Sequence, residues 1–368
     1  MEKYKIILFL PLLFLMSSMK SNVNAQNISF LTDYLNNVSV FDNGNLKQVE
    51  HLPIKSYIVG NNMFAYEDNA GNFKIYHNHF LHKLSSFASS YMVSDNLAAW
   101  KMNTQLKVFD KGSSLTLSTM AQEYFLSDDI VVWFDDYEKK LKAYYNKEIY
   151  ELDDALATGS SNEVFISENI VAFVASQGYL GVFYEGEIED LGYYDRIKSL
   201  EIGRDIIAFV EEPLNNFQVY YFGDISDIES FEPNSYKTGD SFVAYVDANK
   251  YLKVFYNYKV ETISFDEPNF YEVADELMVF GVQNYFKVWY KGQVFTLDSH
   301  IPQNYKINNN VAAWIDQLGY LKFFDGQKVE TISYEKIENF EIHGSCVKYS
   351  FGVHSENIYF QAKTYKND

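Results

Sequence analysis

The chain has 368 residues, of which 47% are hydrophobic and 18% aromatic, with a single cysteine and six prolines. This composition excludes an intrinsically disordered chain, a collagen and a small disulfide scaffold. Fifty acidic side chains against 30 basic ones give a formal net charge of −20, so we expect no nucleic-acid partner, because nucleic acids carry negative charge themselves.

The N-terminal segment has the layout of a secretory signal peptide. Two lysines lie within residues 1–5, an apolar run follows over residues 6–16, and a polar stretch leads to Val23-Asn24-Ala25. The alternative is a membrane anchor, but the run is shorter than the roughly 20 residues that span a bilayer. We therefore expect removal of residues 1–25, no membrane span, and a secreted or periplasmic protein formed by residues 26–368.

A repeat runs through the rest of the chain. An aromatic or large apolar residue, which we call the anchor, recurs at intervals of 33 to 40 residues. The anchors are Leu31, Tyr66, Trp100, Trp133, Phe173, Phe209, Tyr245, Phe280, Trp314 and Tyr349. Twelve to fourteen residues after nine of the anchors comes a glycine or asparagine: Gly44, Asn78, Gly112, Asn146, Gly186, Gly223, Asn257, Gly292 and Gly326.

Each repeat is typical of four short antiparallel strands, which we name a to d. In residues 304–332 the strands are expected at 305–307, 311–316, 320–324 and 329–332, separated by turns rich in Asn, Asp and Gly. The pattern predicts an all-β fold, a β-propeller with four-stranded blades of about 35 residues in a single ring. The alternative is an open β-solenoid, which usually has shorter coils and parallel pairing.

The number of blades follows from the two ends of the repeat region. Eight repeats have all four strands, whereas residues 27–50 lack strand a and residues 340–365 lack a clear strand d. The range is eight to ten blades. We predict nine, because rings often close with one blade built from both termini; two separate incomplete blades would give ten. An insertion at residues 153–162 is the expected elaborated loop.

The refrain V-A-W-x-D-x-x-G-x-L-K-V-F, seen best in residues 311–323 and 243–255, resembles the propeller superfamily that includes TolB-like and WD-type proteins. It is also similar to secreted repeat proteins of Gram-negative bacteria. The resemblance covers nearly all of the mature chain and implies the fold. The Trp-Asp dipeptide that ends WD blades is absent at the matching positions, and the resemblance implies no catalytic residues.

Motifs for chemistry are mostly missing. The sequence contains no phosphate-binding loop, zinc-protease motif or Gly-x-Ser-x-Gly. Gly239-Asp240-Ser241 is similar to the nucleophile motif of some esterases. It occupies the a-to-b turn found in every repeat, so we interpret it as a turn and not as a catalytic motif. His77, His79 and His82 could offer metal ligands but straddle a c-to-d turn, and paired aspartates such as 128–129, 135–136 and 153–154 lack the spacing of a calcium loop.

These negatives predict no catalytic residue, no bound metal and no cofactor. Cys346, the only cysteine, is expected to pack as a small apolar residue. The four tryptophans are expected to pack between blades.

Acids and tyrosines recur at the b-to-c turns, which all fall on one face of a propeller. We predict a ligand-binding surface there, composed of Tyr137, Tyr179, Tyr251, Tyr285, Tyr320, Asp135, Asp247 and Asp316. Carboxylates accept hydrogen bonds from sugar hydroxyls and aromatic rings cover apolar sugar faces; the same groups also bind basic peptides. The alternative is that the tyrosines cap blade edges and the acids keep the surface soluble.

Two functions follow from these patterns. The first is a secreted, non-catalytic binding or scaffold protein that recognises a carbohydrate or protein partner through the turn face. The alternative is a secreted polysaccharide hydrolase or lyase with a carboxylate pair near the central channel. The spacing of carboxyl groups in the structure distinguishes the two.

Overall fold

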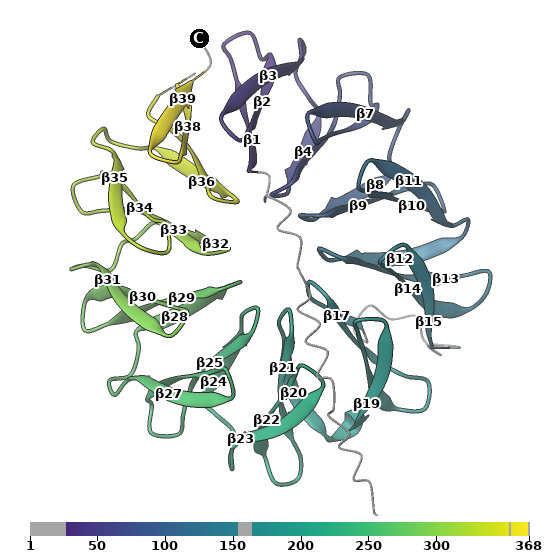
Figure 1. Ribbon diagram of the computed structural model, residues 1–368, viewed down its shortest axis with the longest axis vertical. Coiled ribbons are helices and arrows are strands. Elements are labelled where there is room, and N and C mark those ends of the chain that lie inside the picture. Colours follow the sequence, from purple (N-terminus) through teal and green to yellow (C-terminus); the bar gives the residue numbers. More distant parts are fainter. Residues whose placement is uncertain (1–26, 154–163, 353–354, 367–368) are drawn as a thin grey trace, which may run out of the picture.

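The computed structural model describes residues 27–153, 164–352 and 355–366. Ten antiparallel sheets follow one another around a common axis and form a single all-β ring (Figure 1). The helix in the described part is one 3-10 turn, η2 (Tyr194–Arg196), and none there is long and apolar enough to cross a membrane. The predicted signal peptide and most of the 153–162 insertion lie outside the described residues.

The first five blades take up residues 28–193. Blade 1 has three strands, β1 (Ile28–Thr32), β2 (Val38–Asp42) and β3 (Asn45–Glu50). Blade 2 contains β4 (Ser56–Val59), β5 (Met63–Glu67), β6 (Phe73–His77) and β7 (Phe80–Ser85). Blade 3 contains β8 (Ser90–Val93), β9 (Leu97–Met102), β10 (Gln105–Asp110) and β11 (Ser113–Ser118). Blade 4 contains β12 (Ala121–Leu126), β13 (Ile130–Asp135), β14 (Lys140–Tyr145) and β15 (Glu148–Asp153). Blade 5 contains β16 (Val164–Ile166), β17 (Ile170–Val174), β18 (Tyr179–Tyr184) and β19 (Glu187–Tyr193).

The other five blades have four strands each. Blade 6 contains β20 (Ile197–Ile202), β21 (Ile206–Glu211), β22 (Asn216–Tyr221) and β23 (Asp224–Glu229). Blade 7 contains β24 (Ser235–Thr238), β25 (Phe242–Val246), β26 (Leu252–Tyr256) and β27 (Lys259–Ser264). Blade 8 contains β28 (Phe270–Ala274), β29 (Leu277–Val282), β30 (Tyr285–Tyr290) and β31 (Gln293–Asp298). Blade 9 contains β32 (Tyr305–Asn308), β33 (Val311–Ile315), β34 (Leu321–Phe324) and β35 (Val329–Ser333). Blade 10 contains β36 (Asn339–His343), β37 (Cys346–Ser350), β38 (Glu356–Phe360) and β39 (Lys363–Lys366).

The two sequence markers have clear structural causes. All ten anchors lie on strand b and are at most 5% exposed, because this strand is covered by a neighbouring blade on each side. The nine glycine or asparagine markers lie in the c-to-d turns, and each has a positive φ, between 48° and 95°. Glycine and asparagine tolerate that conformation, which tight hairpin turns require.

The hydrophobic core lies between blades rather than inside any one of them. Among the described residues, ten apolar clusters each join two neighbouring blades, the last of them joining blade 10 to blade 1. Cys346 belongs to that last cluster and is fully buried. Burial raises the pKa of its thiol, so it packs as a small apolar residue.

The ring has ten blades, so the prediction of nine is wrong. The predicted composite blade does not form: β1 pairs with β2, and β36 to β39 make a complete blade of their own. The sequence concealed the last strand because β39 is polar and mostly exposed. Its turn uses Gln361 and Ala362 at φ of 46° and 60° in place of glycine or asparagine.

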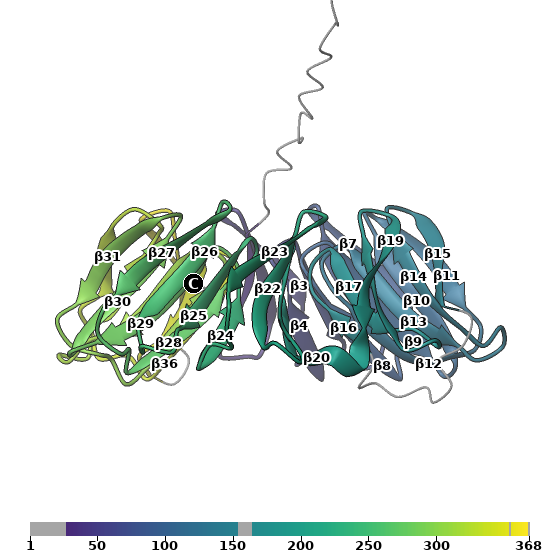
Figure 2. The ribbon, with the colours of Figure 1, turned by 90° about the horizontal axis from the view of Figure 1, so that it is seen from below.

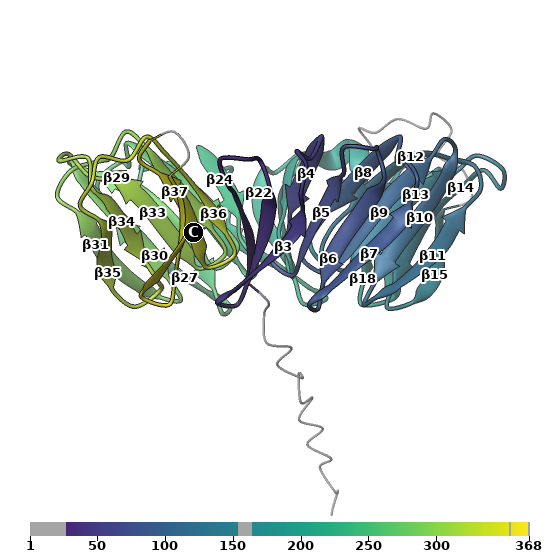
Figure 3. The same cartoon turned by 90° about the horizontal axis from the view of Figure 1, so that it is seen from above.

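A side chain of blade 10 takes over one hydrogen bond that strand a makes in other blades. In blade 9, the backbone N–H of Ile315 donates to the carbonyl of Asn304, just before strand a, at 3.0 Å. The equivalent N–H of Thr32 donates to Glu356 Oε2 at 2.7 Å. Lys348 Nζ lies 3.0 Å from the other oxygen of Glu356. Blades 1 and 10 lie side by side in both the axial view and the side view (Figures 1 and 3).

A partly buried ion-pair motif joins neighbouring blades at three places. In blade 7, Lys253 Nζ lies 2.8 Å from Glu229 of blade 6 and 2.9 Å from Asp247 of its own b-to-c turn. The anchor Tyr245 also donates to Glu229, at 2.9 Å. The same arrangement recurs around Lys74 in blade 2 and Lys322 in blade 9.

Candidate functional site: the mouth of the central channel

The a-to-b turns bring one repeated position to the axis of the ring. This position, five residues before the anchor, is occupied in blades 2 to 10 by Asn61, Asp95, Asp128, Glu168, Arg204, Asp240, Asp275, Asn309 and Gly344. A cavity of about 400 Å³ is lined by a-to-b residues of blades 2, 3 and 6 to 10 together with Asn27 of blade 1. Residues from opposite sides of the ring can share one cavity only at the axis. We call it the channel mouth.

The turns around the mouth are held to one another by hydrogen bonds. The backbone N–H of Asn61 donates to Asp95 Oδ1 at 2.8 Å, and that of Asp95 donates to Asp128 Oδ1 at 2.9 Å. Further round the ring, the N–H of Asp240 donates to the carbonyl of Asp275 at 2.7 Å. Gly239 is required at its position, because a Cβ on it would lie 2.6 Å from that same carbonyl oxygen.

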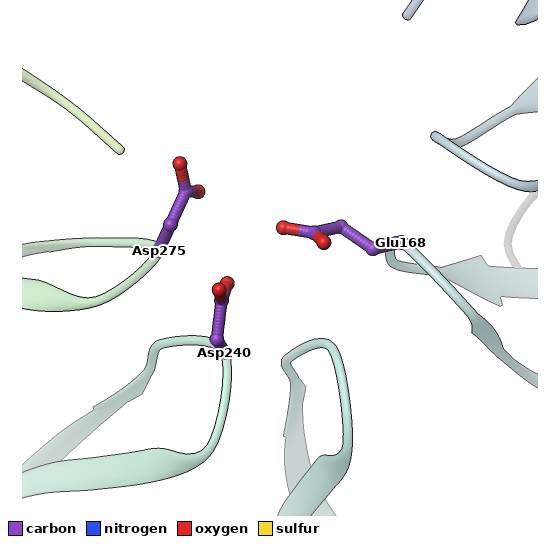
Figure 4. Close-up of side chains that lie close together, drawn as sticks. All are labelled: Glu168, Asp240 and Asp275. Carbon is purple, nitrogen blue, oxygen red and sulfur yellow. The ribbon is translucent and has the colours of Figure 1, made fainter. Parts of the chain in front are cut away.

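Three carboxyl groups meet at the mouth, where Asp240 and Asp275 line the cavity and Glu168 lies beside them. Glu168, Asp240 and Asp275, from blades 5, 7 and 8, each present an oxygen within 4.8 Å of the others. Figure 4 shows the three side chains extending from separate loops toward the same space. Arg204 of the intervening blade 6 places Nη1 2.9 Å from Glu168 Oε2 and 3.9 Å from Asp240 Oδ2. One guanidinium therefore serves two carboxyl groups.

Burial shifts these carboxyl groups toward their protonated forms. Burial raises the pKa of Glu168 to about 9 and that of Asp240 to about 7, and the neighbouring acids add to both shifts. The pKa of Asp128 is raised to about 7 for the same reasons, and burial also raises the pKa values of Asp95 and Asp275. Carboxyl groups this close share protons, so the mouth carries less negative charge at neutral pH than its formal count.

The mouth therefore offers three kinds of chemistry. Its protonated carboxyl groups donate hydrogen bonds, while its ionised carboxyl groups and amide oxygens accept them. Glu168, Asp240 and Asp275 together are also the one set of three metal-ligating side chains found close together in the described residues, although the sequence predicted no metal. A cation there would displace protons from the cluster.

The three histidines singled out in the sequence do not form such a set in the described part of the chain. His79 Nδ1 lies 2.7 Å from Asp42 Oδ2. His77 is buried, and burial lowers its pKa.

The predicted turn-face residues lie at the other end of strand b, away from the mouth. The aspartates are engaged by their own blades: Asp247 Oδ1 accepts hydrogen bonds from the N–H groups of Asn249 and Tyr251, both at 2.9 Å. Asp316 binds the N–H groups of Leu318 and Tyr320, and Asp135 those of Tyr137 and Glu138. These carboxylates hold the turns and, in blades 7 and 9, a strand-c lysine.

The predicted tyrosines lie at the surface. Tyr137 is 79% exposed and Tyr285 46% exposed. The other three each lie against a ring at the end of, or just after, strand d of their own blade: Tyr179 on Tyr193, Tyr251 on Phe265 and Tyr320 on Tyr334, with centroids 4.4 to 5.5 Å apart. They do not pack between blades. Their role in binding remains a prediction.

The sequence analysis did not predict the mouth, because its acids are recognisable only by their shared position relative to the anchor. The turn sequences identified the residues as turn formers, and Asp240 was set aside for that reason. Five acids at the position five residues before the anchor were the available signal. Their convergence depends on ring closure, which no single repeat encodes.

Comparison with known proteins identifies the architecture. Residues 22–365 match the sequence family described as the 10-bladed beta propeller domain. Comparison with curated protein sequences gives no match.

Similar solved structures include the computationally designed Ika8 protein (18% identity, TM-score 0.33, covering 72% of this chain and 93% of that chain). Prp20p from Saccharomyces cerevisiae is 10% identical with a TM-score of 0.33, covering 63% of this chain and 81% of that chain. Hsv2p from Kluyveromyces lactis is 12% identical with a TM-score of 0.31, covering 64% of this chain and 92% of that chain.

Proposed function

We propose that this chain, which belongs to the family of 10-bladed β-propeller domains, is a secreted, non-catalytic binding protein that recognises a neutral glycan at the channel mouth. The architecture by itself specifies no activity. The observation that carries the proposal is the mouth cavity of about 400 Å³, lined by amide and carboxyl side chains from many blades. Such a lining offers many donors and acceptors to hydroxyl groups.

The protonation of the mouth favours a neutral ligand over a strongly cationic one. With the pKa of Glu168 near 9 and that of Asp240 near 7, several carboxyl groups hold protons at neutral pH and act as donors as well as acceptors. Arg204 adds a further donor group. Export through the predicted signal peptide would place the protein among extracellular or periplasmic glycans.

A glycan array with the purified mature protein tests the proposal, followed by calorimetry on the best oligosaccharide. Asp275→Ala should weaken binding about tenfold, because the ligand loses the hydrogen bonds that this buried carboxyl group would make with it. The control is the double variant Tyr251→Ala and Tyr320→Ala on the opposite face, which should bind as the wild type does. Binding lost in the control and kept in Asp275→Ala would move the site to the turn face.

A second candidate is a polysaccharide hydrolase, favoured by the spacing of the carboxyl groups. The carboxyl oxygens of Glu168 and Asp240 lie within 4.8 Å, near the roughly 5–5.5 Å of retaining glycosidases. A protonated Glu168 beside a more acidic Asp240 resembles the pairing of a general acid with a nucleophile. Release of reducing ends from a bound polysaccharide, abolished by Glu168→Gln, would establish this activity over the binding role.

A further inference from the structure

A cluster of exposed aromatic rings lies on the same face of the ring as the channel mouth. Strands alternate in direction within each blade, so the c-to-d turns lie on the face that carries the a-to-b turns (Figure 2). In blades 6 and 7 the c-to-d turns carry Phe222, which is 47% exposed, and Tyr258, which is 58% exposed. Both rings contact Tyr221, at the end of strand β22, with centroids 4.5 and 4.9 Å apart. We call these three residues the aromatic platform.

The two exposed rings occupy backbone positions that disfavour an aromatic residue. Except in blade 9, each c-to-d turn has two residues, both with a positive φ, which is 49° for Phe222 and 60° for Tyr258. This conformation is unfavourable for a bulky side chain and easy for glycine or asparagine. The other turns of this length place Gly, Asn, Ala or a polar or charged residue there. The turn itself therefore does not require these rings, and strained residues of this kind are concentrated at functional sites.

Backbone hydrogen bonds connect the platform to the mouth. The N–H of Phe222 donates to the carbonyl of Asp205 at 3.4 Å, and the N–H of Asp205 donates to the carbonyl of Asp240 at 2.8 Å. Asp240 lines the mouth, and so does Arg204, which directly precedes Asp205. The platform is therefore held in a fixed position beside the hydrogen-bonding groups of the mouth.

The platform and the mouth together offer the two kinds of contact that a sugar makes. Exposed rings cover the apolar face of a pyranose, and the mouth supplies donors and acceptors for hydroxyl groups. The charges next to the rings balance, because Asp224 and Lys259, the first residues of strand d in blades 6 and 7, are exposed and opposite in sign. The formal net charge of −20 repels anionic polysaccharides. These charges favour a neutral oligosaccharide.

We propose that the aromatic platform binds one sugar unit of a neutral oligosaccharide whose neighbouring units lie in the channel mouth, with the apolar face of that unit against Phe222 and Tyr258. The inference rests on the proposed function and adds a second subsite to it. Both rings are exposed, so a sugar reaches them without any rearrangement of the blades. Tyr221, which is 3% exposed, supports both rings from within blade 6.

Two variants remove the rings and keep the turns. Phe222→Asn and Tyr258→Gly each create an Asn-Gly turn like that of blade 1, because Gly223 follows the first position and Asn257 precedes the second. Each variant loses a ring and gains a residue that suits a positive φ. The probes are the neutral hexasaccharides of cellulose, starch and mannan, each titrated against the full mature chain by calorimetry.

Each variant should bind the preferred hexasaccharide about five- to tenfold more weakly, because one ring no longer covers the sugar. The melting temperature of each should equal or exceed that of the wild type, because the strained turn position is relieved. Two matched controls should bind as the wild type does. Lys111→Asn creates an Asn-Gly turn in blade 3 without removing a ring, and Phe80→Ser removes an exposed ring from the c-to-d hairpin of blade 2.

The outcomes separate this inference from the proposed function. If Asp275→Ala weakens binding while both platform variants bind normally, the platform is not a subsite and the mouth remains the site. Lower melting temperatures with unchanged binding would show that the rings serve packing alone. If only the platform variants weaken binding, the mouth is not part of the site and the shared subsite is wrong. Failure of all three hexasaccharides to bind would overturn the platform, and a glycan array without any binder would overturn the proposed function as well.

Discussion

The two ends of strand β25 should respond to pH in opposite ways. Asp240 lies just before this strand in the channel mouth, and burial and neighbouring acids raise its pKa from 3.8 to about 7. Asp247 lies just after it; although burial opposes the change, hydrogen bonds from Lys253 and the turn amides lower its pKa. The substitutions Asp240→Asn and Asp247→Asn therefore probe the same strand with opposite expected signs.

The size of the stability change expected for Asp240→Asn follows from the dependence of folding stability on the pKa of this group. A carboxyl group whose pKa is raised on folding stabilises the protein below its unfolded pKa, and this stability is lost as the pH rises through the folded pKa. A pKa raised from 3.8 to about 7 corresponds to about 4 kcal/mol. Because Asp240 titrates together with Glu168, this figure is an upper bound for the single group.

Asp240→Asn should therefore gain stability over the wild type as the pH rises. We expect a difference below about 1 kcal/mol at pH 4 and of about 2–4 kcal/mol at pH 8. For a domain of this length, the pH 8 difference corresponds to about 3–6 °C in melting temperature. Thermal unfolding followed by circular dichroism at pH 4, 6 and 8 measures it.

Asp247→Asn is the control with the opposite sign. A lowered pKa contributes stability above the unfolded pKa and loses it as the pH falls through the folded pKa. This variant should be less stable than the wild type at pH 8, with the difference shrinking toward pH 3. A constant difference across the pH range for Asp240→Asn, or a loss of stability at pH 8, would contradict the raised pKa of Asp240 and the shared protons of the mouth.

Three further predictions concern the scaffold and the turn face. Lys253→Met should cost about 1–3 kcal/mol in unfolding free energy, because the buried Asp247 and the partly buried Glu229 lose their counter-ion. The exposed pair Lys250–Glu267 provides the control, since Lys250→Met should cost less than about 1 kcal/mol. Glu356→Ala should cost about 1–3 kcal/mol in unfolding free energy, because it leaves the Thr32 N–H without its acceptor. The exposed Glu338→Ala is the control, and equal chemical-denaturation midpoints for the two variants would argue against a role of Glu356 in joining blades 10 and 1. The double variant Tyr251→Ala and Tyr320→Ala should melt within about 2 °C of the wild type, since these rings lie at the surface and not between blades; a large drop would mean that they belong to the core.

The fold was predictable because each repeat contains the residues that mark its own strands and turns. Turn residues such as Gly326 act within one blade, and anchors such as Trp314 recur in every repeat although they pack against the neighbouring blade; both markers lie where the pattern predicted. The blade count depended on blade 10, where the turn at Gln361 and Ala362 lacks the usual residues.

The candidate site was harder to predict because it belongs to the whole ring. An acid in a turn sequence looks the same whether it faces solvent or a cluster, and only closure brings Glu168 to within 4.8 Å of Asp275. The turn-face aspartates illustrate a contact that the repeat pattern alone does not reveal. Asp247 recurs with the period of a binding surface, but the lysine six residues later is its partner. In this chain, an acid at the b-to-c turn that is followed six residues later by a strand-c lysine indicates an ion pair between neighbouring blades.

The closure between blades 10 and 1 has a consequence for how this architecture changes during evolution. In blades 2 to 10, all four strands are continuous in sequence, and no sheet combines strands from the two ends of the described chain. Duplication or deletion of one repeat would therefore insert or remove one whole blade without splitting any sheet. What must be preserved is the seam, where Glu356 accepts the hydrogen bond of the Thr32 N–H and is held by Lys348. Rings of different circumference are thus accessible by unequal recombination of about 35 codons, and the diameter of the channel mouth would change with each step.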